Sequence, residues 1–166
     1  MFDKKKAVFK RKELDLNEMV DNAAHSFSLR VEHTGGKISQ DIGAVDSLMY
    51  VDEIHFTNVI FNLMDNAIKY RKPDKPVNIV LSTWNDKEHL YLSIEDDGVG
   101  IKKDNLKKIF DKFYRVHTGN VHDVKGFGLG LAYVKKIVDL HDGEIRVDSE
   151  YGKGTKFTIS LPIIES

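Results

Sequence analysis

Residues 51–70 read VDEIHFTNVIFNLMDNAIKY, and the rest of the sequence is best understood around this stretch. Asp52 is a suitable helix N-cap, and neither Gly nor Pro interrupts the residues that follow it. Apolar side chains then recur at spacings of three and four, which predicts an amphipathic helix with one buried face. The residues of that face are Phe56, Val59, Ile60, Leu63, Met64 and Ala67.

A second stripe of the same helix is polar, because positions four apart lie one turn apart. It consists of Asn58, Asn62, Asn66, Lys69 and Tyr70. Asn is a poor helix former, so these asparagines need another reason to stand there. The stripe is either a solvated polar face or a surface whose amide oxygens and ammonium group face a polyanion and its metal ion.

Composition limits the classes of protein that fit. The 166 residues suffice for one domain, and the apolar (41%) and charged (31%) contents are typical of soluble globular proteins. A net charge of −1 gives no reason to expect a nucleic acid or an anionic membrane as partner. Without cysteine, disulfides and thiolate metal sites are excluded.

Neither a signal peptide nor a membrane span is predicted. Residues 1–6, MFDKKK, have no apolar run behind their charges, and no apolar stretch approaches the ~20 residues that span a bilayer. We therefore expect a cytoplasmic domain over residues 7–166, without membrane contact and preceded by a linker at residues 1–6.

Along the chain, sequence patterns predict mixed helices and strands. Asp15 and Glu18 have the spacing of a capping box before a helix that a Gly-Gly pair ends, and residues 131–140 predict a further helix ended by Asp-Gly. Short strands are predicted at 7–12, 37–42, 47–51, 77–83, 90–94, 144–147 and 155–161. The order favours an α+β fold, a two-layer α/β sandwich with helices packed on one face of a mixed, mainly antiparallel sheet.

The motif DDGVG follows one of the predicted strands, after a hairpin whose turn is expected at Asn85-Asp86. Gly98 and Gly100 allow a tight turn and a close approach of a flat ligand to the backbone. Asp96 could accept a hydrogen bond from an exocyclic amine. An ordinary turn explains Asp-x-Gly-x-Gly equally well, because Asp and Gly are turn residues.

The motif KGFGLGL lies at residues 125–131, between a polar loop and a predicted helix. A helix N-terminus offers unpaired N–H groups and a positive dipole end, which suit phosphate. The motif matches neither a Walker A sequence nor a dinucleotide fingerprint, and a flexible glycine hinge is the alternative. The preceding loop, 116–127, is of a length that is usually functional or mobile.

Histidines do not predict a metal site, although the chain contains seven. His117 and His122 share the polar loop but lack a usual ligand spacing and a nearby third ligand. His55 lies at the start of the central helix, where a packed or hydrogen-bonded imidazole is expected.

Taken in order, these motifs resemble those of the catalytic and ATP-binding domain of bacterial sensor histidine kinases, in the superfamily shared with gyrase-type ATPases. NLMDNAIKY (62–70) resembles the N box, EDDGVGI (95–101) the G1 box and IFDKFYR (109–115) the F box. KGFGLGLA resembles the G2 box, and YGKGT (151–155) the last glycine motif. The resemblance covers nearly the whole chain and implies a Bergerat-type ATP-binding fold with ATP and Mg²⁺ as cofactors.

The resemblance also implies roles for matching residues. Asn66 would coordinate Mg²⁺ through its amide oxygen, the kind of ligand that this hard cation prefers. Asn62, Lys69 and Arg115 would position the phosphates, and Asp96 would bind the adenine amino group. The other implied nucleotide contacts are Tyr70, Gly98, Gly100, Ile101, Tyr114, Lys125, Gly126, Gly128, Leu129, Gly130, Leu131 and Thr155, with residues 116–127 as a lid.

Asn62 stands where hydrolases of the superfamily carry a Glu that activates water, and an amide cannot act as a general base. The resemblance therefore implies a protein histidine kinase domain that delivers the γ-phosphoryl group to an external nucleophile and hydrolyses ATP poorly. No histidine of this chain lies in the His-Glu or His-Asp motif, followed by Pro, that carries the phosphorylated histidine in this family.

The acceptor is therefore expected on a separate dimerisation domain, with residues 1–6 as the tail of its second helix and a response regulator downstream. The isolated chain is expected to be monomeric, and a membrane anchor elsewhere in the parent protein is left open. Two alternatives remain: a serine kinase of the anti-sigma-factor type and a non-catalytic, nucleotide-binding regulatory module.

Overall fold

The computed structural model describes residues 9–111 and 127–163, with only the backbone described at 127–129. The elements, in chain order, are β1 (Arg11–Asp15), α1 (Leu16–His33), β2 (Ile38–Ile42), β3 (Leu48–Asp52), α2 (Glu53–Lys69), β4 (Ile79–Asn85), β5 (His89–Asp96), α3 (Lys103–Leu106), α4 (Phe127–Leu140), β6 (Glu144–Glu150) and β7 (Gly154–Pro162). None of the described helices is long and apolar enough to cross a membrane.

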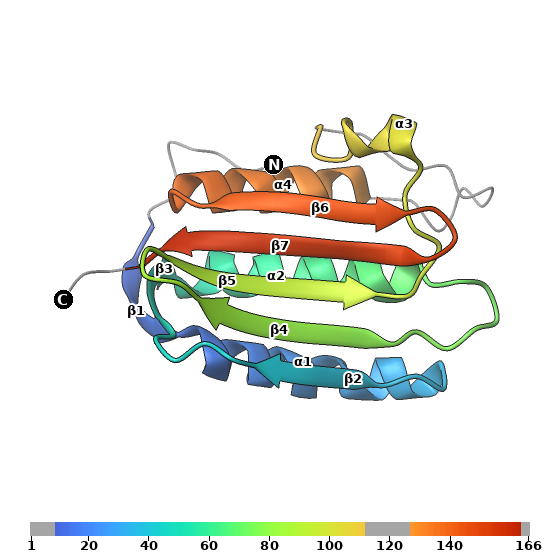
Figure 1. Cartoon of the computed structure of the whole chain (residues 1–166), viewed down its shortest axis with the longest axis horizontal. Helices are drawn as coiled ribbons and strands as arrows, with labels where there is room; N and C mark the ends of the chain where they lie inside the picture. Colours follow the sequence, from blue (N-terminus) through green and yellow to red (C-terminus); the bar gives the residue numbers. More distant parts are fainter. Residues whose placement is uncertain (1–8, 112–126, 164–166) are drawn as a thin grey trace.

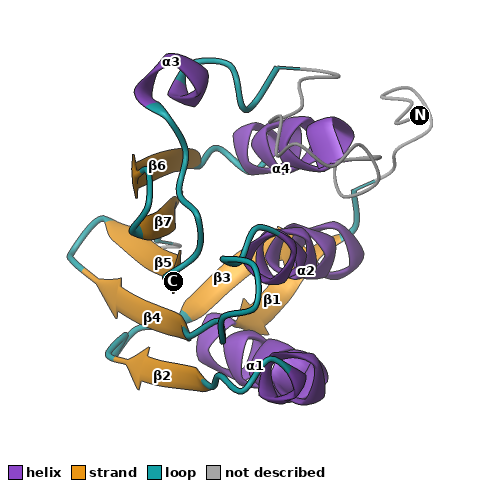
Figure 2. Ribbon diagram, turned by 90° about the vertical axis from the view of Figure 1, so that its right-hand side faces the viewer, coloured by secondary structure: helices purple, strands orange, loops and turns teal. Residues whose placement is uncertain are grey.

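Five strands form one sheet in the order β2-β4-β5-β7-β6. β2 runs parallel to β4, and the other neighbouring strands are antiparallel. α1, α2 and α4 lie side by side on one face of this sheet, while α3 lies beside β6 outside that helical layer (Figures 1 and 2). β1 and β3 form a separate antiparallel pair. The α+β sandwich predicted from the sequence is confirmed.

The core lies between the sheet and the helical layer. All six apolar residues predicted for the inner face of α2 are buried. The strands contribute alternate residues, such as Leu81 and Thr83 of β4 and Leu92 and Ile94 of β5, because successive strand side chains point to opposite faces. The residues that sequence spacing predicts for the inner faces of these elements are thus the residues that are buried.

Helix ends follow the predicted caps. The Asp52 carboxylate accepts a hydrogen bond from the His55 N–H at 3.0 Å, and the Asp15 carboxylate accepts one from the Asn17 N–H at 2.9 Å. Gly35, with φ +88°, follows the end of α1. One detail of the prediction is wrong: α2 ends at Lys69, so Tyr70 is its C-cap and not part of the helical stripe.

The predicted first strand is displaced. The sequence pattern places it at residues 7–12, whereas β1 runs from Arg11 to Asp15 because its backbone pairs with β3. Residues 1–8 lie outside the described part of the chain, so the expected linker is not tested. The short helix α3 precedes Ile109, which is buried in the core.

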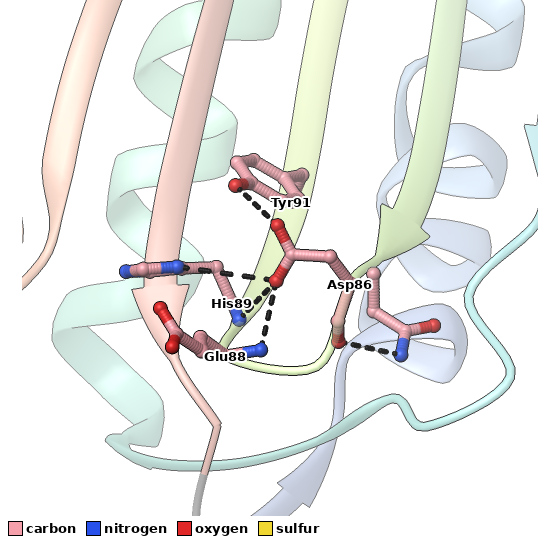
Figure 3. Close-up of polar contacts among 5 residues, drawn as sticks. Asp86, Glu88, His89 and Tyr91 are labelled. Atoms are coloured by element: carbon pink, nitrogen blue, oxygen red, sulfur yellow. Dashed lines mark hydrogen bonds and ion pairs between the residues drawn. The ribbon is translucent and has the colours of Figure 1, made fainter.

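The β4–β5 hairpin turns where the sequence predicts it. The Asp86 carboxylate accepts hydrogen bonds from the N–H groups of Glu88 (2.8 Å) and His89 (2.7 Å) and from the Tyr91 hydroxyl (2.9 Å), as Figure 3 shows. These hydrogen bonds lower the pKa of Asp86. The Tyr91 ring stacks on Trp84 with a centroid distance of 5.2 Å and an interplanar angle of 8°.

Candidate nucleotide-binding site

Four segments meet at the end of the sheet that lies opposite the β4–β5 hairpin. They are the C-terminal half of α2, the turn after β5, the start of β7 and the first turns of α4. Asp96 is the last residue of β5 and pairs with Thr155 of β7. The turn after it is tied to α2, because the Val99 N–H donates to the Tyr70 carbonyl at 2.9 Å.

Gly98 and Gly100 let this turn pack against its neighbours. A Cβ atom at Gly98 would lie 2.5 Å from the Tyr70 carbonyl oxygen, and one at Gly100 would lie 2.2 Å from the Glu150 carbonyl oxygen. Gly100 also has φ +75°, a conformation that L side chains rarely adopt. The sequence pattern indicates a close approach of a ligand to these glycines, and the contacts in the structure are with the backbone of the protein itself.

Asp96 is a half-buried carboxyl group at the base of the site. Burial raises its pKa to about 7, and hydrogen bonds from the backbone N–H groups of Gly98 and Thr155 act in the opposite direction. The nearby charges of Asp97 and Glu95 raise the pKa further. The Gly98 N–H donates to the Asp96 Oδ1 atom at 2.8 Å. An oriented carboxylate in a poorly solvated place is a strong acceptor for an amino group.

Ser149 of β6 joins the two sides of this region. Its hydroxyl donates to the Gly154 carbonyl and accepts from the Ile101 N–H, both at 2.8 Å, and lies 2.8 Å from the Thr155 hydroxyl. Ile101 and the buried Thr155 are therefore held in a fixed relation. Sequence reasoning missed Ser149, and the only signal for it was its place two residues beyond a predicted strand, in alternation with the apolar Val147.

The residues of the polar stripe of α2 differ in their contacts. The Asn62 side-chain N–H donates to the Asn58 carbonyl at 2.8 Å, and Asn66 is buried. Within residues 9–111 and 127–163, no group is hydrogen-bonded to the Asn66 carboxamide. The Lys69 ammonium forms an ion pair with Asp65 at 3.3 Å, and Asp65 also pairs with Arg30 of α1 at 2.8 Å.

The start of α4 supplies the opposite wall. A Cβ atom at Gly130 would lie 3.3 Å from the Asn62 Oδ1 atom, a tight contact, so the glycine lets α4 approach the α2 amide closely. Leu131 is half-buried against the core, and Gly128 and Leu129 belong to the first turn of the helix. Tyr114, Arg115, Lys125 and Gly126, with most of the predicted lid, lie outside the described residues.

Histidines do not build a metal centre in the part of the chain that the structure describes, where no cluster of three or more His, Asp or Glu side chains could hold an ion. His55 Nδ1 lies 2.7 Å from the Tyr133 hydroxyl, which confirms the expectation of a hydrogen-bonded imidazole. The combination of an asparagine-bearing helix, a carboxyl group at a strand end and a glycine-rich helix start resembles that of ATP-binding domains of the Bergerat type.

The chain belongs to the family of histidine kinase-, DNA gyrase B- and HSP90-like ATPases, which it matches over residues 51–165. It is 57% identical over its whole length to the sensor protein RprX of Bacteroides fragilis and spans 32% of that protein. It corresponds to the ATP-binding catalytic domain of a two-component sensor histidine kinase, as the sequence motifs predict.

Solved structures agree on the fold. The nucleotide-free catalytic domain of the histidine kinase ThkA is 23% identical, with a TM-score of 0.80 over 93% of this chain and 98% of that one. Full-length ShkA in complex with AMPPNP is also 23% identical, with a TM-score of 0.80 over 96% of this chain and 32% of ShkA. ThkA in complex with the response regulator TrrA gives a TM-score of 0.77 at 22% identity, over 95% of this chain and 43% of that one.

Proposed function

We propose that this domain binds ATP with Mg²⁺ and transfers the γ-phosphoryl group to a histidine on a separate dimerisation domain. The observation that carries the proposal is the pairing of two sites on one surface: the Asp96 carboxyl group at the end of β5, and the Asn62–Gly130 approach between α2 and α4. The first suits an amino-substituted base, and the second suits a phosphate chain.

At the adenine end, ionised Asp96 would accept a hydrogen bond from the exocyclic amino group. The Gly98 N–H fixes the Oδ1 atom, and the carboxylate can still accept a further hydrogen bond from a ligand, because its two oxygens offer about four lone-pair sites. Thr155 and Ile101, held together through Ser149, would border the base. The complex of ShkA with AMPPNP supports an ATP-like ligand for this fold.

At the phosphate end, the N–H groups in the first turn of α4 have no acceptor within the helix and lie at its positive dipole end. Asn62 and Lys69 would approach the phosphates from α2. Asn66 has a carboxamide oxygen suited to Mg²⁺ and no hydrogen-bond partner among the described residues. Bound Mg²⁺ would supply charge neutralisation on the phosphate oxygens.

Transfer rather than hydrolysis follows from Asn62, because an amide cannot remove a proton from water. Two of the described histidines are engaged inside the fold and do not suit the role of acceptor: His55 pairs with Tyr133, and buried His141 lies between Asp52 and Ile137. No histidine of this chain lies in a His-Glu or His-Asp motif followed by Pro, so the acceptor would be in trans. The complex of ThkA with TrrA supports a response regulator as the downstream partner. The use of ATP would place this reaction in the cytoplasm.

Transfer in trans is the direct test. The protein is incubated with radiolabelled ATP, Mg²⁺ and the dimerisation domain of RprX, the relative with 57% identity. We expect acid-labile, alkali-stable phosphate on the dimerisation domain and none on this chain. Nucleotide binding without transfer would favour a regulatory module, and acid-stable phosphate on serine would favour a serine kinase.

Asn66→Ala is expected to remove the Mg²⁺ dependence of ATP binding. In the wild type, Mg²⁺ should raise the affinity for ATP, because the Asn66 amide oxygen would hold the metal ion, which would neutralise phosphate charge. In the variant the gain should be at least about tenfold smaller, as for the loss of a hydrogen bond to a charged group. Calorimetric titration with and without Mg²⁺ measures the effect, and Asn22→Ala on the exposed side of α1 is the matched control. An unchanged Mg²⁺ gain in Asn66→Ala would contradict this role.

A further inference from the structure

The contact between α2 and α4 contains a row of polar groups, of which the proposed function assigns only the pair nearest the phosphates to the ligand. We call it the α2–α4 seam and define it by Asp52 with His141, His55 with Tyr133, and Asn62 with Gly130. Residue numbers rise along α2 as they fall along α4, so the two helices run antiparallel and the pairs form successive levels. The last level belongs to the phosphate end of the candidate site.

Tyr133 occupies the middle level of the seam. Its hydroxyl lies 2.7 Å from His55 Nδ1 and is also hydrogen-bonded to the side chain of Asn58. A tyrosine hydroxyl is neutral at physiological pH, and burial raises the pKa of this one further. One phenol from α4 thus joins two side chains of α2 that lie three residues apart, on the same face of that helix.

The middle level is connected to the phosphate end through Asn58. The backbone carbonyl of Asn58 accepts the hydrogen bond from the Asn62 side chain at 2.8 Å. The Asn62 amide oxygen, in turn, faces the Gly130 backbone, where a Cβ atom would lie only 3.3 Å away. The hydroxyl of Tyr133 therefore stands one residue contact away from a group that we assign to the phosphates.

The lower level receives the segment that precedes α1. Buried His141 donates from Nδ1 to the Ile137 carbonyl at 2.8 Å, and its Nε2 atom accepts from the Asp52 N–H at 3.1 Å, a tautomer that the two partners dictate. The Lys10 N–H donates to the Asp52 carboxylate at 2.9 Å. The Phe9 ring lies 5.1 Å from the His55 ring and 5.6 Å from the His141 ring.

We propose that Tyr133 is a positioning residue that sets the spacing of α2 and α4 at the phosphate end, and that Phe9 couples the N-terminal segment to this spacing through His55 and His141. The inference rests on the proposed ATP site. α2 carries Asn62 and α4 carries the Gly130 backbone, so the two walls of the phosphate site are held by different helices. A small change in their separation misplaces one wall relative to the other, and such misplacement is costly for ligand geometry.

Tyr133→Phe tests the hydroxyl without removing the ring. We expect the affinity for Mg²⁺-ATP to fall about three- to tenfold, as for one lost hydrogen bond, while the affinity for adenosine changes less than about twofold. Adenosine depends on Asp96 and not on the α2–α4 seam, so a general loosening of the fold would not produce this split. Calorimetric titration of both ligands measures it.

The matched control is Tyr91→Phe, which removes a hydroxyl bonded to Asp86 at 2.9 Å on the helix-free face of the sheet. Both affinities should stay unchanged in this variant. Phe9→Ala is the second test variant. Its affinity for Mg²⁺-ATP should fall as in Tyr133→Phe, and its affinity for adenosine should stay nearly unchanged. Phe9→Tyr keeps the aromatic ring, so its affinities for Mg²⁺-ATP and adenosine should match those of the wild type.

Equal losses for ATP and adenosine in Tyr133→Phe would overturn the inference, because they indicate a structural role. Unchanged ATP affinity in Tyr133→Phe, or in Phe9→Ala, would overturn it as well. Wild-type protein that binds adenosine but not ATP would instead overturn the proposed function, and the inference with it. The two failures are therefore distinguishable in the same set of titrations.

Discussion

Asp96→Asn is expected to lower the affinity of the domain for ATP by about one to two orders of magnitude. The substitution replaces an ionised acceptor by a neutral amide, and a hydrogen bond to a charged group contributes ~1.5–3 kcal/mol. Because the pKa of Asp96 is about 7, the wild-type affinity should rise with pH through that value, whereas the affinity of the variant should stay flat. Calorimetric titration with Mg²⁺-ATP between pH 6 and pH 8 measures both effects.

The same substitution is expected to stabilise the nucleotide-free domain. Because the pKa of Asp96 rises from an ordinary 3.8 to about 7, the folded protein retains a proton that the unfolded chain has lost between those values. The stability that this proton gives is present below the unfolded pKa and is lost as pH rises through about 7. The amide of the Asp96→Asn variant does not titrate and carries no such loss, so the variant should be more stable than the wild type at pH 8.

The expected gain at pH 8 is on the order of 1–3 kcal/mol, allowing for the partial exposure of the carboxyl group, and it should shrink toward pH 5. Urea unfolding followed by circular dichroism measures it. Asp148→Asn, the same change at an exposed position of β6, is the control and should leave both affinity and stability unchanged. A variant less stable than the wild type at both pH values would refute the argument from burial.

Gly154→Ala is expected to cost on the order of 3 kcal/mol or more of unfolding free energy, and to abolish binding of adenosine. A Cβ atom at this position would lie 2.0 Å from the Asp96 carbonyl oxygen, a contact that the β5–β7 pairing cannot relieve without moving Asp96. The backbone at Gly154 also has φ +138°, which L side chains rarely adopt. Urea unfolding and adenosine titration measure the two losses.

Gly152→Ala separates the steric contact from the backbone conformation. Gly152 lies in the same turn with φ +91°, but no atom stands within 4 Å of its added Cβ. This control should cost only ~1 kcal/mol and should keep adenosine binding. If Gly154→Ala were as stable as Gly152→Ala, β7 could move away from Asp96, and the close approach of the two strands would not define the site.

Local patterns predicted much of the fold. The helix that buries Phe56 and Leu63 follows from spacing alone, and the hairpin at Asp86 follows from turn chemistry. The pairing of strands was harder to predict, because it depends on residues that are distant in sequence. The parallel alignment of β2 with β4 and the pairing of β1 with β3 leave no signal in either strand. The displacement of the first strand has this cause.

The residues of the candidate site also divide into those that the sequence could predict and those that it could not. Asp96, Asn62 and Gly130 stand within recognisable motifs and could be predicted, although their roles toward ATP remain proposals. Ser149 and Tyr133 could not be predicted, since each has a hydrogen-bond partner that is distant in sequence: Ser149 with Ile101, 48 positions away, and Tyr133 with His55, 78 positions away. The sequence around a hydroxyl on a strand or helix does not indicate a hydrogen-bond partner that lies so far along the chain.

Trp84 is the only tryptophan of the chain, and its stack on Tyr91 lies at the hairpin end of β4 and β5. The candidate nucleotide site lies at the other end of these strands, where Asp96 pairs with Ile79. Trp84 lies five positions along the strand from Ile79, which is a distance of about 17 Å. The intrinsic fluorescence of the domain should therefore report unfolding from a place distant from the candidate nucleotide site. Stability can be followed at one emission wavelength while the ATP concentration is varied, and the linkage between binding and folding can be measured without a label.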